Sequence, residues 1–244
     1  VGWLSTHQRC WLQTAASTIS PKAWPKIMAK QGRHLIIDGQ VFQTIARHRG
    51  MGRYSEYLLA SLATEGSYKS VTIILSINNH SFDGSDSTKD PMFRDLETVY
   101  LNLQNSNDLP LTQVEEHNKN VVNEYISNLR IKSDDIDFLL LAPFQEPLVS
   151  VFPDSTNKHL IFYDLIPYLN HQQYMHKMPF DKYLAHYKLL FEVDKLLTIS
   201  DSVRDDIITY LGIPADRIGS IHGAAIRSRK TAVPIKGLSL PEKF

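Results

Sequence analysis

The chain has 244 residues, of which 26 are Lys or Arg and 26 are Asp or Glu, so its formal charge at pH 7 is zero. This balance argues against nucleic acid as a partner held by general electrostatics. Apolar residues make up 43% of the chain, as in globular proteins, which excludes disorder for most of it. Cys10 is the single cysteine, which excludes an internal disulfide and a zinc site built on cysteine pairs and favours a reducing compartment.

The segment 1–33 holds all three Trp residues and shows no period of 2 or 3.6. We expect it to be an extension or the tail of a preceding domain, with one irregular helix packed on the main body as the alternative. A single domain is expected over 34–226, and 227–244 is interpreted as the start of a linker to a second domain outside this sequence. No apolar run approaches the roughly 20 residues that a membrane-spanning helix needs.

From residue 34 onward, strand and helix patterns alternate. Strands are predicted at His34–Gly39, Val71–Ile77, Val99–Leu103, Asp137–Ala142, Lys158–Leu165 and Lys195–Ile199, and helices at Tyr54–Ala63, Gln113–Leu129, Pro179–Phe191 and Asp201–Leu211, with an exposed loop over 78–95. The alternation predicts an α/β fold: a Rossmann-like, doubly wound parallel sheet with helices on both faces. In such sheets, ligands bind at the carboxyl ends of the strands.

The segment Arg49-Gly50-Met51-Gly52-Arg53-Tyr54 is expected between the first strand and the first helix. Glycines before a helix allow backbone N–H groups to approach an anion or a sugar. The alternative is a glycine turn that only permits tight packing. A third glycine is absent, and no acidic residue closes the second strand near position 77, so a dinucleotide enzyme such as a dehydrogenase or epimerase is disfavoured.

Two further segments come directly after predicted strands. Tyr163-Asp164 ends an apolar strand, and a carboxylate there is either a site residue or a loop cap. Ser200 most simply caps the next helix, whose end at Gly212 is predicted by the glycine itself. Glu116 and Glu124 are interpreted as solvated residues of an exposed helix face.

Four segments in this order resemble the N-terminal domain of a retaining glycosyltransferase of family 4, which has the GT-B architecture of two facing Rossmann-like domains. They are Ile37-Asp38-Gly39 with the glycine segment 49–54, Phe162-Tyr163-Asp164-Leu165-Ile166-Pro167, the run 197–206, and Leu211-Gly212-Ile213-Pro214 with the residues to Ile218. The resemblance covers about 34–244. Many members have His-Asp where this chain has Tyr163-Asp164, and the variant with Tyr resembles bacterial mannosyltransferases.

The resemblance implies roles for these residues. Asp164 and Tyr163 would be the catalytic pair and hydrogen-bond hydroxyls of the sugar or acceptor. Gly50 and Gly52 would present N–H groups to the donor, Arg53 and Tyr54 would anchor that segment, and Ser200 would lie on the donor side. The family places most of the donor site and a Glu-x7-Glu motif in the second domain, so the spacing of Glu116 and Glu124 is interpreted as accidental.

The resulting hypothesis is the acceptor-side domain of an enzyme that moves a hexose, most simply mannose, from a nucleotide sugar such as GDP-mannose to a saccharide acceptor in bacterial surface polysaccharide synthesis. By resemblance it needs no metal and no other cofactor, and it works in the cytoplasm, with peripheral contact at the inner face of the membrane. The alternative is a non-catalytic Rossmann-like module that binds carbohydrate or serves as a scaffold.

Overall fold

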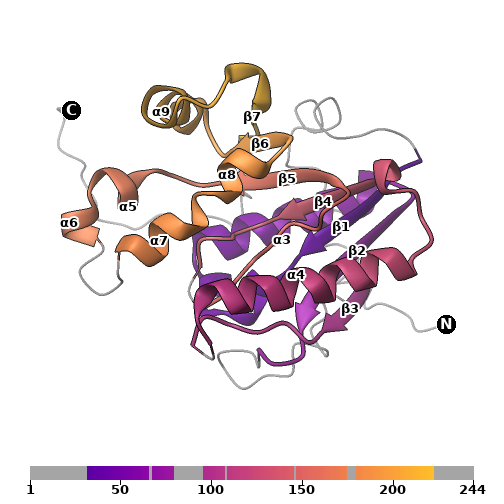
Figure 1. Ribbon diagram of the computed structural model, residues 1–244. Coiled ribbons are helices and arrows are strands. Elements are labelled where there is room, and N and C mark those ends of the chain that lie inside the picture. The colour runs from indigo at the N-terminus through magenta and orange to yellow at the C-terminus, as the bar shows by residue number, and fades with distance from the viewer. Residues whose placement is uncertain are drawn as a thin grey trace, which may run out of the picture.

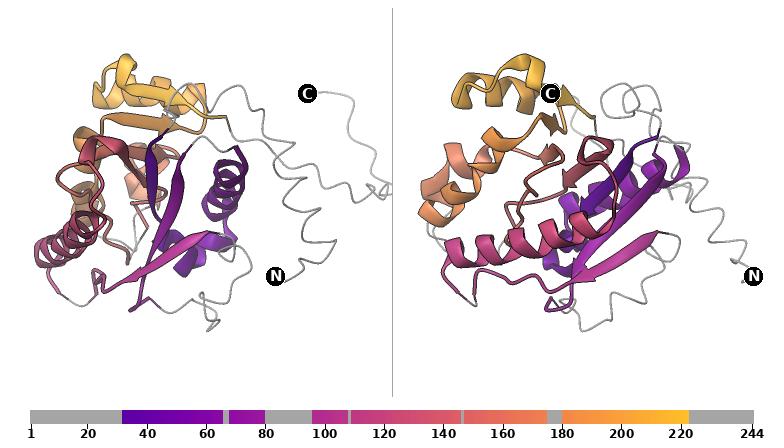
Figure 2. Two further views of the ribbon diagram at one scale, coloured as in Figure 1. Left: turned by 90° about the vertical axis from the view of Figure 1, so that its right-hand side faces the viewer. Right: turned by 45° about the vertical axis from the view of Figure 1, so that its right-hand side comes forward.

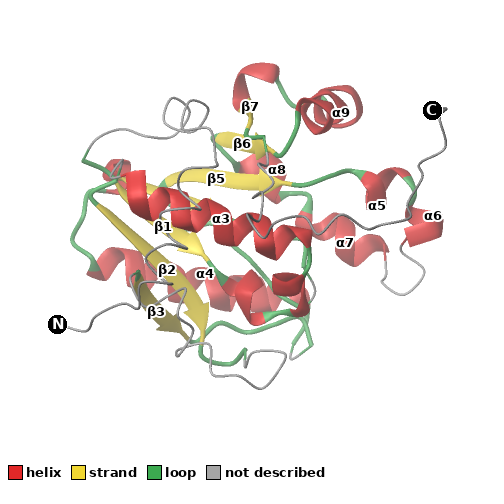
Figure 3. Ribbon diagram, turned by 180° about the vertical axis from the view of Figure 1, so that it is seen from behind, coloured by secondary structure: helices red, strands yellow, loops and turns green. Residues whose placement is uncertain are grey.

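The computed structural model describes residues 32–65, 68–79, 96–107, 109–145, 147–174 and 180–222. Within them, seven strands form one sheet in the order β3-β2-β1-β4-β5-β6-β7, and every neighbouring pair is parallel. Helix α3 covers one face, and α4, α7 and α8 lie over the other (Figures 1 and 2). Seen from behind, α3 crosses in front of the strands (Figure 3). The predicted doubly wound α/β fold is confirmed.

The strands are β1 His34–Asp38, β2 Ser70–Ser76, β3 Glu97–Leu101, β4 Ile136–Leu140, β5 Asn157–Phe162, β6 Lys195–Thr198 and β7 Ile218–Ser220. The helices are α3 Gly50–Glu65, α4 Leu111–Asn128, α5 Ile166–Leu169, α6 His171–Tyr174, α7 Phe180–His186, α8 Leu189–Glu192 and α9 Asp201–Leu211. Short 3₁₀ turns are η1 Gln40–Gln43, η2 Ile45–His48, η5 Ser133–Asp135 and η6 Ala215–Arg217.

Several elements differ from the sequence-based expectation. The strand expected at Val99–Leu103 is Glu97–Leu101, and the helix expected to begin at Tyr54 begins at Gly50. The helix expected over 179–191 is split into α7 and α8, because Tyr187 N–H donates to the Leu184 carbonyl and Leu190 N–H to that of Tyr187, which are tight i to i−3 contacts. The strand expected to reach residue 165 ends at Phe162, and two short helices, α5 and α6, come after it. β7 was not predicted, since three residues carry too little periodicity.

Some expectations lie outside the described residues. These are the extension and its alternative helix over 1–31, most of the loop expected over 78–95, the helix start at Pro179 and the linker over 227–244.

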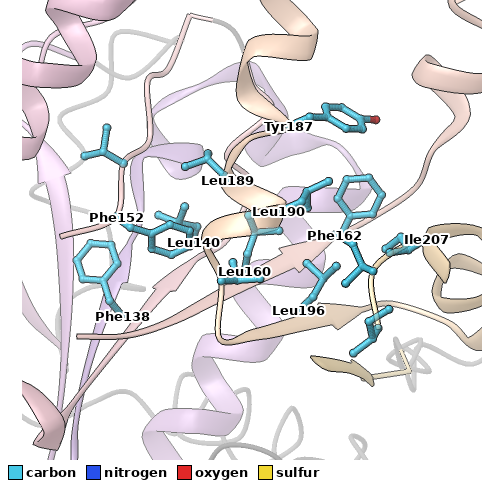
Figure 4. Packing of buried hydrophobic residues seen from close by; sticks show 14 of the residues in the cluster. Phe138, Leu140, Phe152, Leu160, Phe162, Tyr187, Leu189, Leu190, Leu196 and Ile207 are labelled. Atoms are coloured by element: carbon cyan, nitrogen blue, oxygen red, sulfur yellow. The ribbon is translucent and has the colours of Figure 1, made fainter. Parts of the chain in front are cut away.

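Two apolar clusters, one on each face of the sheet, make the core. β-strand side chains alternate between faces, so Ile36, Phe138 and Leu160 pack under α4, α7 and α8, while Ile37 and Leu139 pack under α3. Figure 4 shows the larger cluster, with Phe162 and Leu190 among its labelled residues. Both faces of the central strands are therefore buried, as their continuous apolar runs predict.

The last helix, α9, begins and ends as its sequence predicts. Ser200 Oγ accepts a hydrogen bond of 3.2 Å from the backbone N–H of Val203, and Gly212 ends the helix in the left-handed conformation with φ 66°. These two residues set where α9 starts and stops along the chain.

A buried ionic group lies toward the amino ends of the central strands. Arg33 Nη2 is 2.6 Å from Asp137 Oδ1, and His159 Nε2 is 3.2 Å from the same oxygen. The Asp137 carboxylate is only 2% exposed, so it depends on these donors for the solvation it has lost.

Two tyrosines contact each other at the end of α7: Tyr183 lies in the helix and Tyr187 directly after it. The hydroxyls of Tyr183 and Tyr187 are 3.0 Å apart, and both side chains are buried. Burial raises the pKa of Tyr183 to about 12, and burial together with the neighbouring Tyr183 raises the pKa of Tyr187.

We expect the free energy of unfolding to fall as the pH rises above 10, because the unfolded tyrosines release protons there and the folded ones do not. Each tyrosine contributes a slope of about 1.4 kcal/mol per pH unit until its folded pKa is reached. Urea unfolding between pH 9 and 11.5 measures this slope. Tyr183→Phe should reduce it, and equal slopes for the wild type and the variant would contradict the assignment.

Candidate functional site

The carboxyl edge of the sheet, where β1, β4, β5, β6 and β7 end, gathers the residues that the sequence singled out. The glycine segment forms the first turn of α3, not a loop before it, since the helix begins at Gly50. Gly50 is exposed and Gly52 is buried. A Cβ added to Gly52 would lie 2.3 Å from both Cα and O of Arg47, whereas one added to Gly50 would meet nothing within 4 Å. Gly52 therefore lets α3 pack closely on η2.

The first turn of α3 is a favourable place for negative charge. The first backbone N–H groups of a helix have no acceptor within the helix, and the helix dipole places partial positive charge at this end. Arg49 and Arg53 are exposed beside this turn. Arg47, in η2, forms an ion pair of 3.5 Å with Glu56 of α3. The turn thus joins exposed cations to a helix N-terminus.

Tyr163 connects the end of β5 to α3. Its hydroxyl is 3.0 Å from Ser55 Oγ and donates to the Met51 carbonyl at 3.4 Å. Ser55 is fully buried, so its hydroxyl needs this partner inside the protein. Burial raises the pKa of Tyr163, and the phenol stays neutral at physiological pH. The hydroxyl expected to meet a substrate is thus bonded within the protein.

Tyr54 extends the same connection to β7. Its hydroxyl donates to the carbonyl of Ile221 at 2.9 Å, and its ring meets that of Tyr163 edge to face at 5.8 Å between centroids. Burial also raises the pKa of Tyr54. These two contacts hold α3 against the segments that follow β5 and β7.

Asp164 comes after Tyr163 and is half-buried. Its Oδ1 accepts the backbone N–H of Ile166 at 3.0 Å, which turns the chain into α5. Among the described residues, none donates a hydrogen bond to Oδ2. The carboxylate is close enough to Tyr183 and Tyr187 to raise the pKa of both. Asp164 is therefore a loop cap that uses one of its two carboxylate oxygens.

Ser200 lies at the same edge after β6. Its hydroxyl is used as the cap of α9, and its carbonyl accepts from Thr198 Oγ1 at 3.1 Å. Next to it, Asp201 Oδ2 is 3.4 Å from His222 Nε2 on the exposed surface. By contrast, Glu116 and Glu124 are exposed on α4, as predicted for a solvated helix face.

Sequence reasoning missed two residues at this edge. Gln145, in the segment after β4, donates from Nε2 to Met51 Sδ at 3.6 Å, and nothing in its local sequence marks it. Asp38 ends β1 with a buried carboxylate that accepts two hydrogen bonds from Gln40. Its position before Gly39 indicated only a turn, although a carboxylate that ends a buried strand is the same signal that singled out Asp164.

No group of three His, Cys, Asp or Glu side chains within the described part of the chain is arranged to hold a metal ion. None of the described helices is long and apolar enough to cross a bilayer.

Comparison with known proteins gives a distant relative. The chain is 24% identical over 201 residues to the serotype-specific mannosyltransferase WbdA of Escherichia coli, an alignment that covers 78% of this chain and 24% of the relative. The chain thus spans about a quarter of that protein's length. No family model matches the chain.

The two glycines of α3 provide a matched pair of substitutions. Gly52→Ala should lower the free energy of unfolding by about 1–3 kcal/mol, because its Cβ displaces backbone atoms of Arg47. Gly50→Ala should leave it unchanged or raise it by up to about 1 kcal/mol, because the space is open and alanine favours helix. Urea unfolding of both variants checks this, and equal effects would show that packing on η2 does not require glycine.

Proposed function

We propose that this chain is the acceptor-side half of a glycosyltransferase, with the retaining mechanism and GT-B architecture of family 4. It would move a hexose, mannose first among the candidates, from a nucleotide sugar to a saccharide acceptor of a bacterial surface polysaccharide. The observation that carries the proposal is the contact of Tyr163 with Ser55 and Met51, because it joins two of the four motif segments at one edge of the sheet. The distant similarity to a mannosyltransferase supports a glycosyltransferase role.

The first turn of α3 is proposed to face the donor. Backbone N–H groups at Gly50 and Gly52, with the exposed guanidinium of Arg53, would offset negative charge as it develops on the leaving diphosphate. Such fixed dipoles and cations supply this stabilisation without a metal ion, so we propose that no metal or other cofactor is required. Ser200 remains a donor-side candidate because it lies after β6 at the same edge.

Asp164 is proposed as the residue that contacts the sugar or the acceptor. Its Oδ1 is engaged by Ile166, and its second oxygen could accept a hydrogen bond from a sugar hydroxyl. Tyr163 takes a different role from the one that the resemblance implied. Its hydroxyl is bonded to Ser55, so we propose that it is a positioning residue that holds Asp164 in register with α3.

The proposal extends to the whole protein. A second domain would bind most of the nucleotide sugar, and the enzyme would work in the cytoplasm, in contact with the inner face of the membrane where its acceptor is presented. This chain covers about a quarter of its relative's length, so the substrates and partners of the whole protein are also proposals.

The direct experiment is an assay of the full-length protein against a panel of nucleotide sugars and mannosylated acceptors. We expect product with GDP-mannose and with no donor that carries a different hexose. Residues 1–244 alone should fold but transfer no sugar, since orientation of donor against acceptor needs both halves. Product from a non-mannose donor only would exclude mannose, and no transfer from any donor would favour a scaffold or carbohydrate-binding module.

A residue-level prediction concerns Asp164. In the full-length enzyme Asp164→Asn should lower kcat by about 100-fold or more, because it removes the charge, while the amide oxygen can still accept the N–H of Ile166 and preserve the turn. Ser202→Ala, on the exposed first turn of α9, is the control and should change kcat less than about 2-fold. Full activity in Asp164→Asn would contradict the proposal and show that Asp164 only caps the loop.

A further inference from the structure

Asp38 occupies the point where the sheet changes direction. It is the last residue of β1, in register with Ile74 of β2 on one side and Leu140 of β4 on the other. The chain runs outward from β1 to β2 and β3 on one side and then resumes at β4 on the other. Ligands of doubly wound sheets bind beside this point. Asp38 is only 7% exposed.

The partners of this carboxylate are all neutral. Oδ1 accepts the backbone N–H of Gln40 at 3.0 Å and Oδ2 accepts Nε2 of Gln40 at 3.2 Å. The side chain of Ser150 is close enough to lower the pKa of the same group. Ile74 and Leu140, which face it from the neighbouring strands, carry no charge. Burial raises the pKa of Asp38, and the interactions with Ser150 and Gln40 oppose this rise.

The bonds around the carboxylate connect three segments of the carboxyl edge. Gln40 Oε1 accepts from Asn79 Nδ2 at 3.4 Å. Gln43 Nε2 donates to the carbonyls of Ser76 and Asn79 at 2.8 and 2.7 Å, and its Oε1 accepts from Ser76 N–H. η1 is therefore attached to the end of β2. Ser150 comes from the segment after β4, so the carboxylate lies where the segments that leave β1, β2 and β4 meet.

We propose that Asp38 is a positioning residue of the transfer site, holding these three segments in the arrangement from which α3 presents its first turn. Its link to sugar transfer rests on the proposed function. A buried carboxylate without a cation is costly to a fold, and Asp137 in the same sheet has Arg33 for this purpose. The charge at Asp38 serves orientation of the site at some expense to stability.

The test compares Asp38→Asn with Asp137→Asn in the full-length protein. Asp38→Asn removes one acceptor from the network, so kcat/KM should fall at least about 10-fold through loss of orientation. Its Tm should stay within about 2 °C of the wild type or rise, because a raised pKa means that the ionised carboxylate opposes folding at neutral pH. Asp137→Asn leaves the largely buried guanidinium of Arg33 without its carboxylate, so Tm should fall by about 5 °C or more while kcat/KM of the folded enzyme is kept.

Two further readouts separate positioning from a structural role. Protonation of Asp38 takes away an acceptor, so the wild type should lose kcat/KM on the acid side, and in Asp38→Asn this loss should begin at a lower pH than in the wild type. In residues 1–244, amide hydrogen exchange over 40–49 and 77–79 should be faster in Asp38→Asn. Exchange is measured without substrate, so it tests the network even if the full-length protein transfers no sugar.

If Asp38→Asn does not fold, Gln40→Ala provides the test instead, because Gln40 is the hydrogen-bond partner of Asp38. Gln40→Ala should then show the same loss of kcat/KM and the same faster exchange. Unchanged activity, an unchanged acid limb or unchanged exchange in the folded variant would overturn the proposal. So would a fall in Tm as large as that of Asp137→Asn.

Discussion

The carboxyl edge of this sheet depends on the hydroxyl of Tyr163, which bonds Ser55 and the Met51 carbonyl of α3. The two sides of this contact are more than 100 positions apart in the chain and belong to different loop-and-helix segments. Ser55 is fully buried, and a buried hydroxyl without a partner would destabilise the fold by about 1–3 kcal/mol. The contact therefore fixes Arg53, on the first turn of α3, relative to Asp164, the residue next to Tyr163.

The carboxylates at the two ends of the sheet have different partners. Toward the amino ends, Asp137 Oδ1 lies 2.6 Å from the guanidinium of Arg33 and 3.2 Å from Nε2 of His159, so this buried carboxylate has a cationic neighbour. At the carboxyl edge, Asp38 has only neutral donors and Asp164 keeps an oxygen without a donor among the described residues. Carboxylates with incomplete compensation are typical of functional sites, and both of these lie at strand ends on the edge where doubly wound sheets bind ligands.

Much of the fold could be predicted from the sequence, because its signals are local. Apolar runs such as 136–140 and 195–198 identify strands buried on both faces, and Ser200 and Gly212 mark the ends of α9. The start of α3 could not be predicted, since Gly50 and Gly52 disfavour helix and only the close packing of Gly52 on η2 accounts for the second of them. The engagement of the Tyr163 hydroxyl and the network of Asp38 were also beyond prediction, because their partners lie on other segments.

The central claim is that the carboxyl edge, through α3 and the residues after β5, receives the donor sugar. Amide hydrogen exchange of the full-length protein, with and without the nucleotide sugar that supports transfer, tests it most directly. The account predicts slower exchange at 50–54 and 163–165 when the donor is bound, with no change around Asp137 and His159. Unchanged exchange at the carboxyl edge at a saturating donor concentration, or protection confined to the amino ends of the strands, would contradict it.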